Sequence, residues 1–83
     1  MSNTNNRDFE AWTIPGFFIL YVGAGHNVAI SKIKQRKDFD VMATYTTRKG
    51  QLDAVQFKIP ARLHRGVKSV LQKLESGEYD KVG

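Results

Sequence analysis

The stretch that most constrains how this chain can fold is FFILYV, residues 17–22, an apolar run with chain breakers on both sides. Pro15 and Gly16 precede the run, and Gly23 and Gly25 follow it. The run is rich in aromatic and β-branched residues and is too short for a helix, so it predicts a buried strand. Because it is far shorter than the roughly twenty apolar residues that cross a bilayer, we expect a soluble, cytoplasmic protein.

Three further segments alternate apolar and polar residues, as half-exposed strands do. They are residues 27–33 (NVAISKI), 38–47 (DFDVMATYTT) and 52–59 (LDAVQFKI). In the first segment Ile33 arrives one position out of register, which a bulge near Lys32 would repair. The second segment places on one face Phe39, Val41, Ala43 and Tyr45. Gly50 lies between the last two segments and predicts a hairpin, so the pattern indicates an antiparallel meander.

After these strands the pattern becomes that of an amphipathic helix. Pro60 suits a first helical turn, and apolar residues then recur along one stripe, namely Leu63, Val67, Val70, Leu71 and Leu74. Gly77 predicts a C-terminal cap, and Gly66 inside the helix indicates close packing or the approach of a partner. We therefore predict an α+β fold with a curved antiparallel sheet of three to four strands followed by one C-terminal amphipathic helix. Residues 9–77 are expected to form a single domain, with a mobile leader at 1–8 and a tail at 78–83.

Positive charge is concentrated in the middle of the chain. The formal net charge is +5, but the segment from Lys32 to Lys68 carries ten cations against three carboxylates, a net charge of +7. Four of these cations lie within KIKQRKDF, namely Lys32, Lys34, Arg36 and Lys37. Such asymmetry fits a basic surface that faces a polyanion, and the alternative is a solvated surface whose cations only keep the protein in solution.

Residues 27–74 combine an alternating strand, a basic turn, a strand that ends in Tyr45, a glycine turn, a strand that ends before a proline, and a helix. In this layout the segment resembles the core of the positive-cofactor-four family of transcriptional coactivators. The resemblance implies a curved antiparallel sheet, a dimer formed through the helices, and single-stranded DNA binding on basic, aromatic-bearing strands and loops. It implies nucleic-acid contacts from Lys32, Lys34, Arg36, Lys37, Tyr45 and Arg48.

The residues support the same function independently of that family, because a single strand is bound by cations along its backbone and by flat side chains that stack on its bases. Tyr45, Arg48 and Lys49 lie at one hairpin end, and Lys58 lies on the following strand. We predict a nucleic-acid-binding protein, with single-stranded DNA favoured and a role in transcription regulation or replication. The predicted contacts are Lys32, Lys34, Arg36, Lys37, Tyr45, Arg48, Lys49 and Lys58. A core position for Tyr45 is the alternative.

Two other partner classes stay open. A sheet face laid in a major groove could read double-stranded DNA with Thr44, Gln56 and Lys58. A small interaction or inhibitor protein could instead grip a host protein through Trp12, Ile14 and FFILYV, by strand pairing if that run were an edge strand.

We expect no enzymatic activity and no cofactor or metal, because His26 and His64 are distant in sequence and match no metal spacing. The chain has only 83 residues and no cysteine. A core of this size is close to the lower limit for burial alone to hold a fold, so we expect a homodimer.

Overall fold

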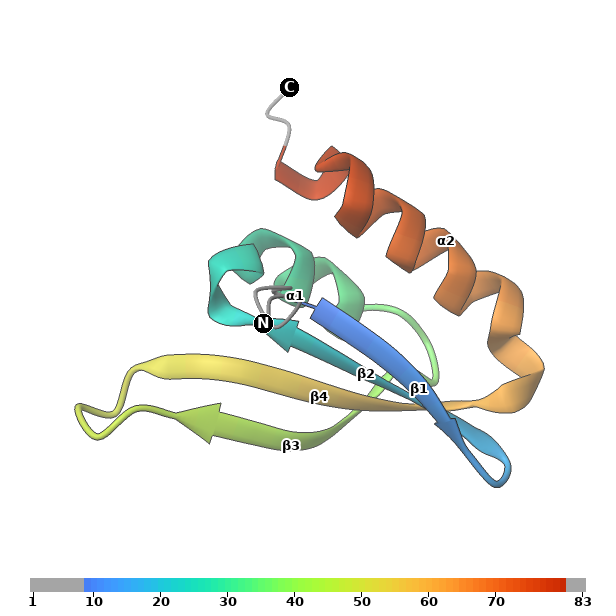
Figure 1. Ribbon diagram of the computed structural model, residues 1–83, viewed down its shortest axis with the longest axis horizontal. Coiled ribbons are helices and arrows are strands. Elements are labelled where there is room, and N and C mark those ends of the chain that lie inside the picture. The colour runs from blue at the N-terminus through green and yellow to red at the C-terminus, as the bar shows by residue number, and fades with distance from the viewer. Residues whose placement is uncertain (1–8, 81–83) are drawn as a thin grey trace, which may run out of the picture.

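The computed structural model describes residues 9–80, which form a four-stranded sheet with two helices (Figure 1). The strands are β1 (Phe9–Ile14), β2 (Phe17–Gly23), β3 (Asp40–Thr46) and β4 (Leu52–Pro60). All neighbours pair antiparallel in the order β1-β2-β4-β3. The helices are α1 (Asn27–Lys34) and α2 (His64–Ser76). The predicted α+β fold with an antiparallel sheet is confirmed, although the sheet is not strongly curled and a second helix is present.

The core lies between one face of the sheet and the two helices, which cover the same face (Figure 1). Val55, Phe57 and Ile59 of β4 are fully buried there, as their shared face predicted. FFILYV forms the central strand β2, in which Leu20 and Val22 face this core. Because β1 and β4 flank β2 on its two sides, this strand has no open edge for pairing with a partner.

Helix α1 corrects the prediction of a strand over residues 27–33, and with it the first strand that the family layout requires. Its buried residues are Ala29, Ile30 and Ile33, at spacings of one and three, which is a helical stripe. Val28, which alternation had paired with Ile30, is exposed instead. The position of Ile33, first explained by a bulge, was the sign of helical periodicity. A segment of eight residues is short enough to fit both periods, and packing against the sheet decides between them.

Strand β3 contains a bulge that the alternating pattern of residues 38–47 concealed. Val41 lies opposite Phe57, but Ala43 lies opposite Gln56, so that Met42 is the extra residue. An extra residue reverses the inward and outward alternation that follows it. Phe39, in the loop before β3, is therefore buried in the core, whereas Tyr45 lies on the other side of the sheet. The prediction that these residues share one face is wrong.

Helix α2 has the predicted apolar stripe, with Val67, Val70 and Leu74 buried. It begins later than predicted, because Pro60 ends β4 and a 3-10 turn, η3 (Ala61–Leu63), intervenes before the helix. The end agrees with the prediction. Gly77 adopts a left-handed conformation at φ 74°, and its N–H donates to the carbonyl of Leu74.

The packed region extends past Gly77, where the predicted domain ends. A last 3-10 turn, η4 (Glu78–Asp80), carries Tyr79 into the core cluster, so at least this part of the predicted tail belongs to the fold. Burial raises the pKa of the Tyr79 hydroxyl because it disfavours the phenolate, and the charge of Arg36 acts in the opposite direction. The predicted leader at residues 1–8 and the rest of the tail lie outside the described residues.

Within residues 9–80, neither α1 nor α2 has the length and apolar character of a membrane-crossing helix.

Candidate functional site

The sheet face turned away from the helices carries aromatic side chains from three strands; we call it the open face. Strand register assigns its members, because residues paired across antiparallel strands point to the same side. Trp12 of β1 is paired with Ile19, and Ile19 is paired with Lys58 of β4. Tyr21 of β2 pairs with Gln56. The aromatic residues of the open face are Trp12, Phe17, Tyr21 and Tyr45.

Tyr45 lies on this face with 44% of its surface exposed. Its hydroxyl donates a hydrogen bond of 3.0 Å to Oε1 of Gln56, and its ring centroid is 6.3 Å from that of Tyr21. Ala54, directly opposite Tyr45, has a side chain small enough for the two rings to meet across β4, and it is fully covered. The alternative of a core position for Tyr45 is therefore wrong. One part of the ring is held by its neighbours while another part meets solvent.

Lys58 supplies positive charge in the middle of the open face. Its Nζ lies 4.2 Å from the centroid of the Phe17 ring, a cation–π geometry that orients the ammonium group along the sheet. Asp40, the first residue of β3, is paired opposite Lys58. Glu10 lies on the same face, opposite Tyr21. The face itself is thus mixed in charge, and its character is set by its aromatic rings.

The centre of the open face is shielded from solvent although no helix covers it. Ile19 is only 2% exposed, while Trp12 beside it and Ile14 are 40% and 39% exposed. Large neighbouring side chains therefore shield the β2 backbone and stand out toward solvent themselves. This arrangement offers flat, partly held ring surfaces to a ligand.

Arg48 and Lys49 lie in the β3–β4 turn at one end of the open face, and both are exposed. The turn has the predicted form: Gly50 has φ 81°, and its N–H donates to the carbonyl of Thr47 at 2.9 Å. The structure therefore brings together on or beside one face four of the predicted contacts, namely Tyr45, Arg48, Lys49 and Lys58.

The other four predicted contacts lie in the helical layer, and KIKQRKDF is not a turn between strands. Lys32 and Lys34 belong to α1, and Arg36 and Lys37 lie in the loop from α1 to β3. Lys32, Lys34 and Lys37 are exposed. Arg36 is half-buried, with its guanidinium carbon 4.9 Å from the centroid of the Phe39 ring, so it packs against the protein.

Sequence reasoning named Trp12, Phe17 and Tyr21 only as parts of a segment that could bind a host protein, and did not place them on one face with Tyr45 and Lys58. The signal was present as alternation within FEAWTI, where Trp12 and Ile14 share one side, and within FFILYV, where Phe17, Ile19 and Tyr21 share one side. A continuous apolar run suggested burial on both faces, and so concealed that only one face is covered.

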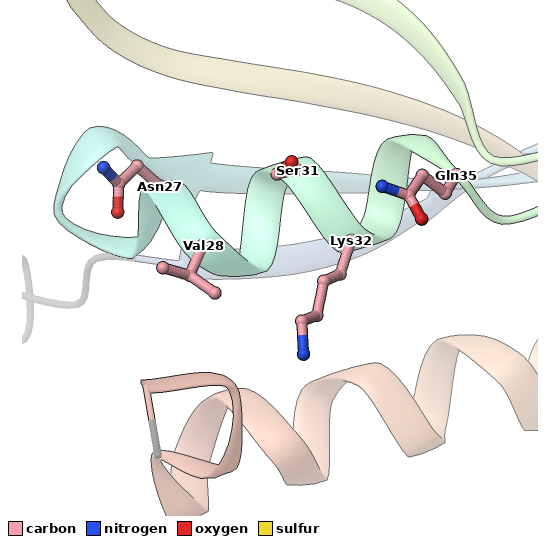
Figure 2. A pocket seen from close by; sticks show the side chains of 5 residues that line it. All are labelled: Asn27, Val28, Ser31, Lys32 and Gln35. Carbon is pink, nitrogen blue, oxygen red and sulfur yellow. The ribbon is translucent and has the colours of Figure 1, made fainter. Parts of the chain in front are cut away.

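An open hollow of about 420 Å³ lies beside α1 (Figure 2). Its lining comes from α1 and the residue after it, namely Asn27, Val28, Ser31, Lys32 and Gln35. It holds a single charged side chain and lies in the helical layer, away from the aromatic rings. Over residues 9–80, no three His, Cys, Asp or Glu side chains gather closely enough to hold a metal ion.

The chain was compared with known proteins at three levels. No family model, curated protein or solved structure matches it.

Proposed function

We propose that the open face binds single-stranded nucleic acid, with single-stranded DNA favoured, by stacking bases on its aromatic rings. The observation that carries this proposal is the presence of exposed Trp12 and Tyr45 on an uncovered sheet face beside Lys58. Four-stranded sheets with helices on one face and aromatic residues on the other are a recurring platform for single strands. Each base stacked on such a ring is worth about 1–3 kcal/mol.

The residues divide into two roles. Trp12 and Tyr45, the most exposed rings, receive bases, while Tyr21 and Phe17 support them from β2. Lys58 on the sheet and Arg48 and Lys49 in the turn meet phosphates, which are the groups that give single-strand binding its strong salt dependence. Double-stranded DNA fits this face less well, because protruding rings keep a duplex groove from approaching the sheet. The proposal includes a cytoplasmic protein that acts in transcription or replication.

The only tryptophan of the chain lies on the open face, which allows a direct test. A single-stranded oligothymidine of about eight nucleotides, within the usual site size of single-strand binders, is titrated against the protein. Stacking on the indole should quench Trp12 fluorescence. Binding confined to the helical layer would leave this fluorescence unchanged, and that result would contradict the proposal.

Substitutions at Tyr45 separate stacking from hydrogen bonding. Tyr45→Leu removes the ring and should weaken binding about 5- to 150-fold, the equivalent of one lost stacked base. Tyr45→Phe keeps the ring, loses the hydrogen bond to Gln56, and should bind nearly as well as the original chain. The salt slope should be unchanged in both variants, because stacking releases no counterions.

Lys58→Gln is the complementary variant. It should reduce the slope of log K against log salt by about 0.7, the value for one phosphate contact on a single strand. Fluorescence anisotropy of the labelled oligonucleotide at several salt concentrations measures both effects. Equal affinities for Tyr45→Leu and Tyr45→Phe would show that the ring takes no base.

A further inference from the structure

A second group of cations lies where the α1–β3 loop meets the start of α2; we call it the basic corner. Its exposed members are Lys34, Lys37, Arg62 and Arg65, of which Arg62 is ion-paired. Residues 34–39 and 61–66 together carry five Lys and Arg side chains and one carboxylate, Asp38. The two segments are separated in sequence, so the concentration of charge arises from folding.

Specific contacts hold the two segments of the basic corner together. Nη2 of Arg62 lies 2.9 Å from Oδ2 of Asp38, in an ion pair that joins η3 to the loop. Arg36 packs over Phe39 and against Gly66, where a Cβ atom would lie only 3.2 Å from Nη2 of Arg36. Two of the five cations therefore hold the corner in place. The remaining three stay exposed to solvent, so their like charge persists at the surface.

The basic corner adjoins one end of the open face. Asp40 is paired with Lys58, and Asp38 lies two residues before Asp40. Arg62 lies four residues after Lys58. At a maximum of about 3.6 Å per residue, the backbones of Asp38 and Arg62, the ion pair of the corner, lie within roughly 15 Å of that of Lys58. Arg48 and Lys49 lie at the opposite end of the β3–β4 hairpin. Positive charge therefore flanks the aromatic rings at both ends.

We propose that the basic corner binds the phosphate backbone of a single strand that has left the open face beside Lys58, and so extends the binding site to longer strands. This inference rests on the proposed function of the open face. Charge complementarity favours a nucleic-acid strand as the ligand of the corner, since three exposed cations near one ion-paired carboxylate suit a polyanion. The corner has no exposed Phe, Tyr or Trp ring, and its one exposed ring is the imidazole of His64, so it adds chiefly phosphate contacts.

The test compares two strand lengths with two variants of equal charge. The corner variant is Lys37→Gln with Arg65→Gln, and the control variant is Lys32→Gln with Lys73→Gln. The probes are oligothymidines of about eight nucleotides, within the usual site size, and of about twenty nucleotides, beyond it. In the original chain the longer strand should bind more tightly. The corner variant should lose about tenfold of its affinity for the longer strand at low salt and show a slope smaller by about 1.4, for two contacts.

The control variant should keep the gain in affinity with length, and both variants should bind the short strand as the original does. Equal losses in the two variants would overturn the proposal, because net charge alone would then account for the effect. An equal loss for short and long strands would also overturn it. Quenching of Trp12 by the short strand tests the open face separately. The long strand could bind in a way that depends on the corner and yet leave Trp12 fluorescence unquenched. That result would overturn both the open-face site and the continuous path.

Discussion

At the scale of single residues, Gly66 shows how one position joins α2 to the α1–β3 loop. A Cβ atom built there would lie 3.3 Å from Cζ of Phe39 and 3.2 Å from Nη2 of Arg36. Nη2 is the far end of a long, flexible side chain, but Phe39 is buried in the core. Glycine in a helix costs about 1 kcal/mol relative to alanine, so close packing here offsets a real cost.

Gly66→Ala is therefore expected to lower the free energy of unfolding by about 1 kcal/mol, because overpacking against the Phe39 ring exceeds the gain in helix propensity. Urea denaturation measures the change. In a Phe39→Leu background the ring is gone, and the same substitution should raise stability. An increase in stability in the original background would show that the core yields to the added methyl group.

At the scale of elements, the bulge in β3 determines the position of Tyr45. Without the extra residue Met42, Tyr45 would share a face with Val41, opposite Phe57 and under the helices. The bulge therefore releases an aromatic ring to the open face. It also makes edge strand β3 irregular, which disfavours pairing with another chain.

Helix α2 gives a direct test of the packing. Leu74 is 4% exposed and belongs to the core cluster, so Leu74→Ala should cost about 2–5 kcal/mol. Leu71 is half-buried and should cost less when truncated. Gln72→Ala, on the exposed side of the same helix, should change stability by no more than about 0.5 kcal/mol. Thermal or urea unfolding of the three variants measures the ranking, and equal effects of Leu74→Ala and Gln72→Ala would refute the burial of this stripe.

At the scale of the whole molecule, the two edges of the sheet differ. Strand β1 pairs with β2 without a bulge over six residues, whereas β3 has two irregularities. The exposed side chains of Trp12 and Ile14 lie on β1. A regular, apolar edge strand is suited to pairing with a second copy, which would continue the sheet and double the open face.

We therefore expect a homodimer formed along β1. Sedimentation equilibrium at micromolar concentration should give twice the 9.4 kDa of the chain, and Ile14→Lys should return the mass to that of one chain by placing charge at the seam. Val41→Lys, at the irregular edge, is the matched control and should leave the dimer intact. A mass of one chain for the unaltered protein would contradict the expectation.

The elements whose signals are local could be predicted from the amino-acid sequence. The breakers around FFILYV delimit β2, Gly50 marks the hairpin, and the stripe with its cap at Gly77 defines most of α2. Each of these depends on periodicity or on backbone conformations that few residues adopt. Arg48, Lys49 and Lys58 lie along one hairpin for the same reason, since the turn and β4 are contiguous.

Which faces of the elements are covered depends on how the elements pack together. Residues 27–34 satisfy the period of a strand or of a helix, and packing against the sheet selects the helix. Strand order and register bring Trp12 onto the same face as Tyr45, and the bulge at Met42 turns Tyr45 toward it. The cations of KIKQRKDF were placed in the helical layer by the same packing. A run of apolar residues indicates that burial is favourable. The element that covers the run comes from elsewhere in the chain.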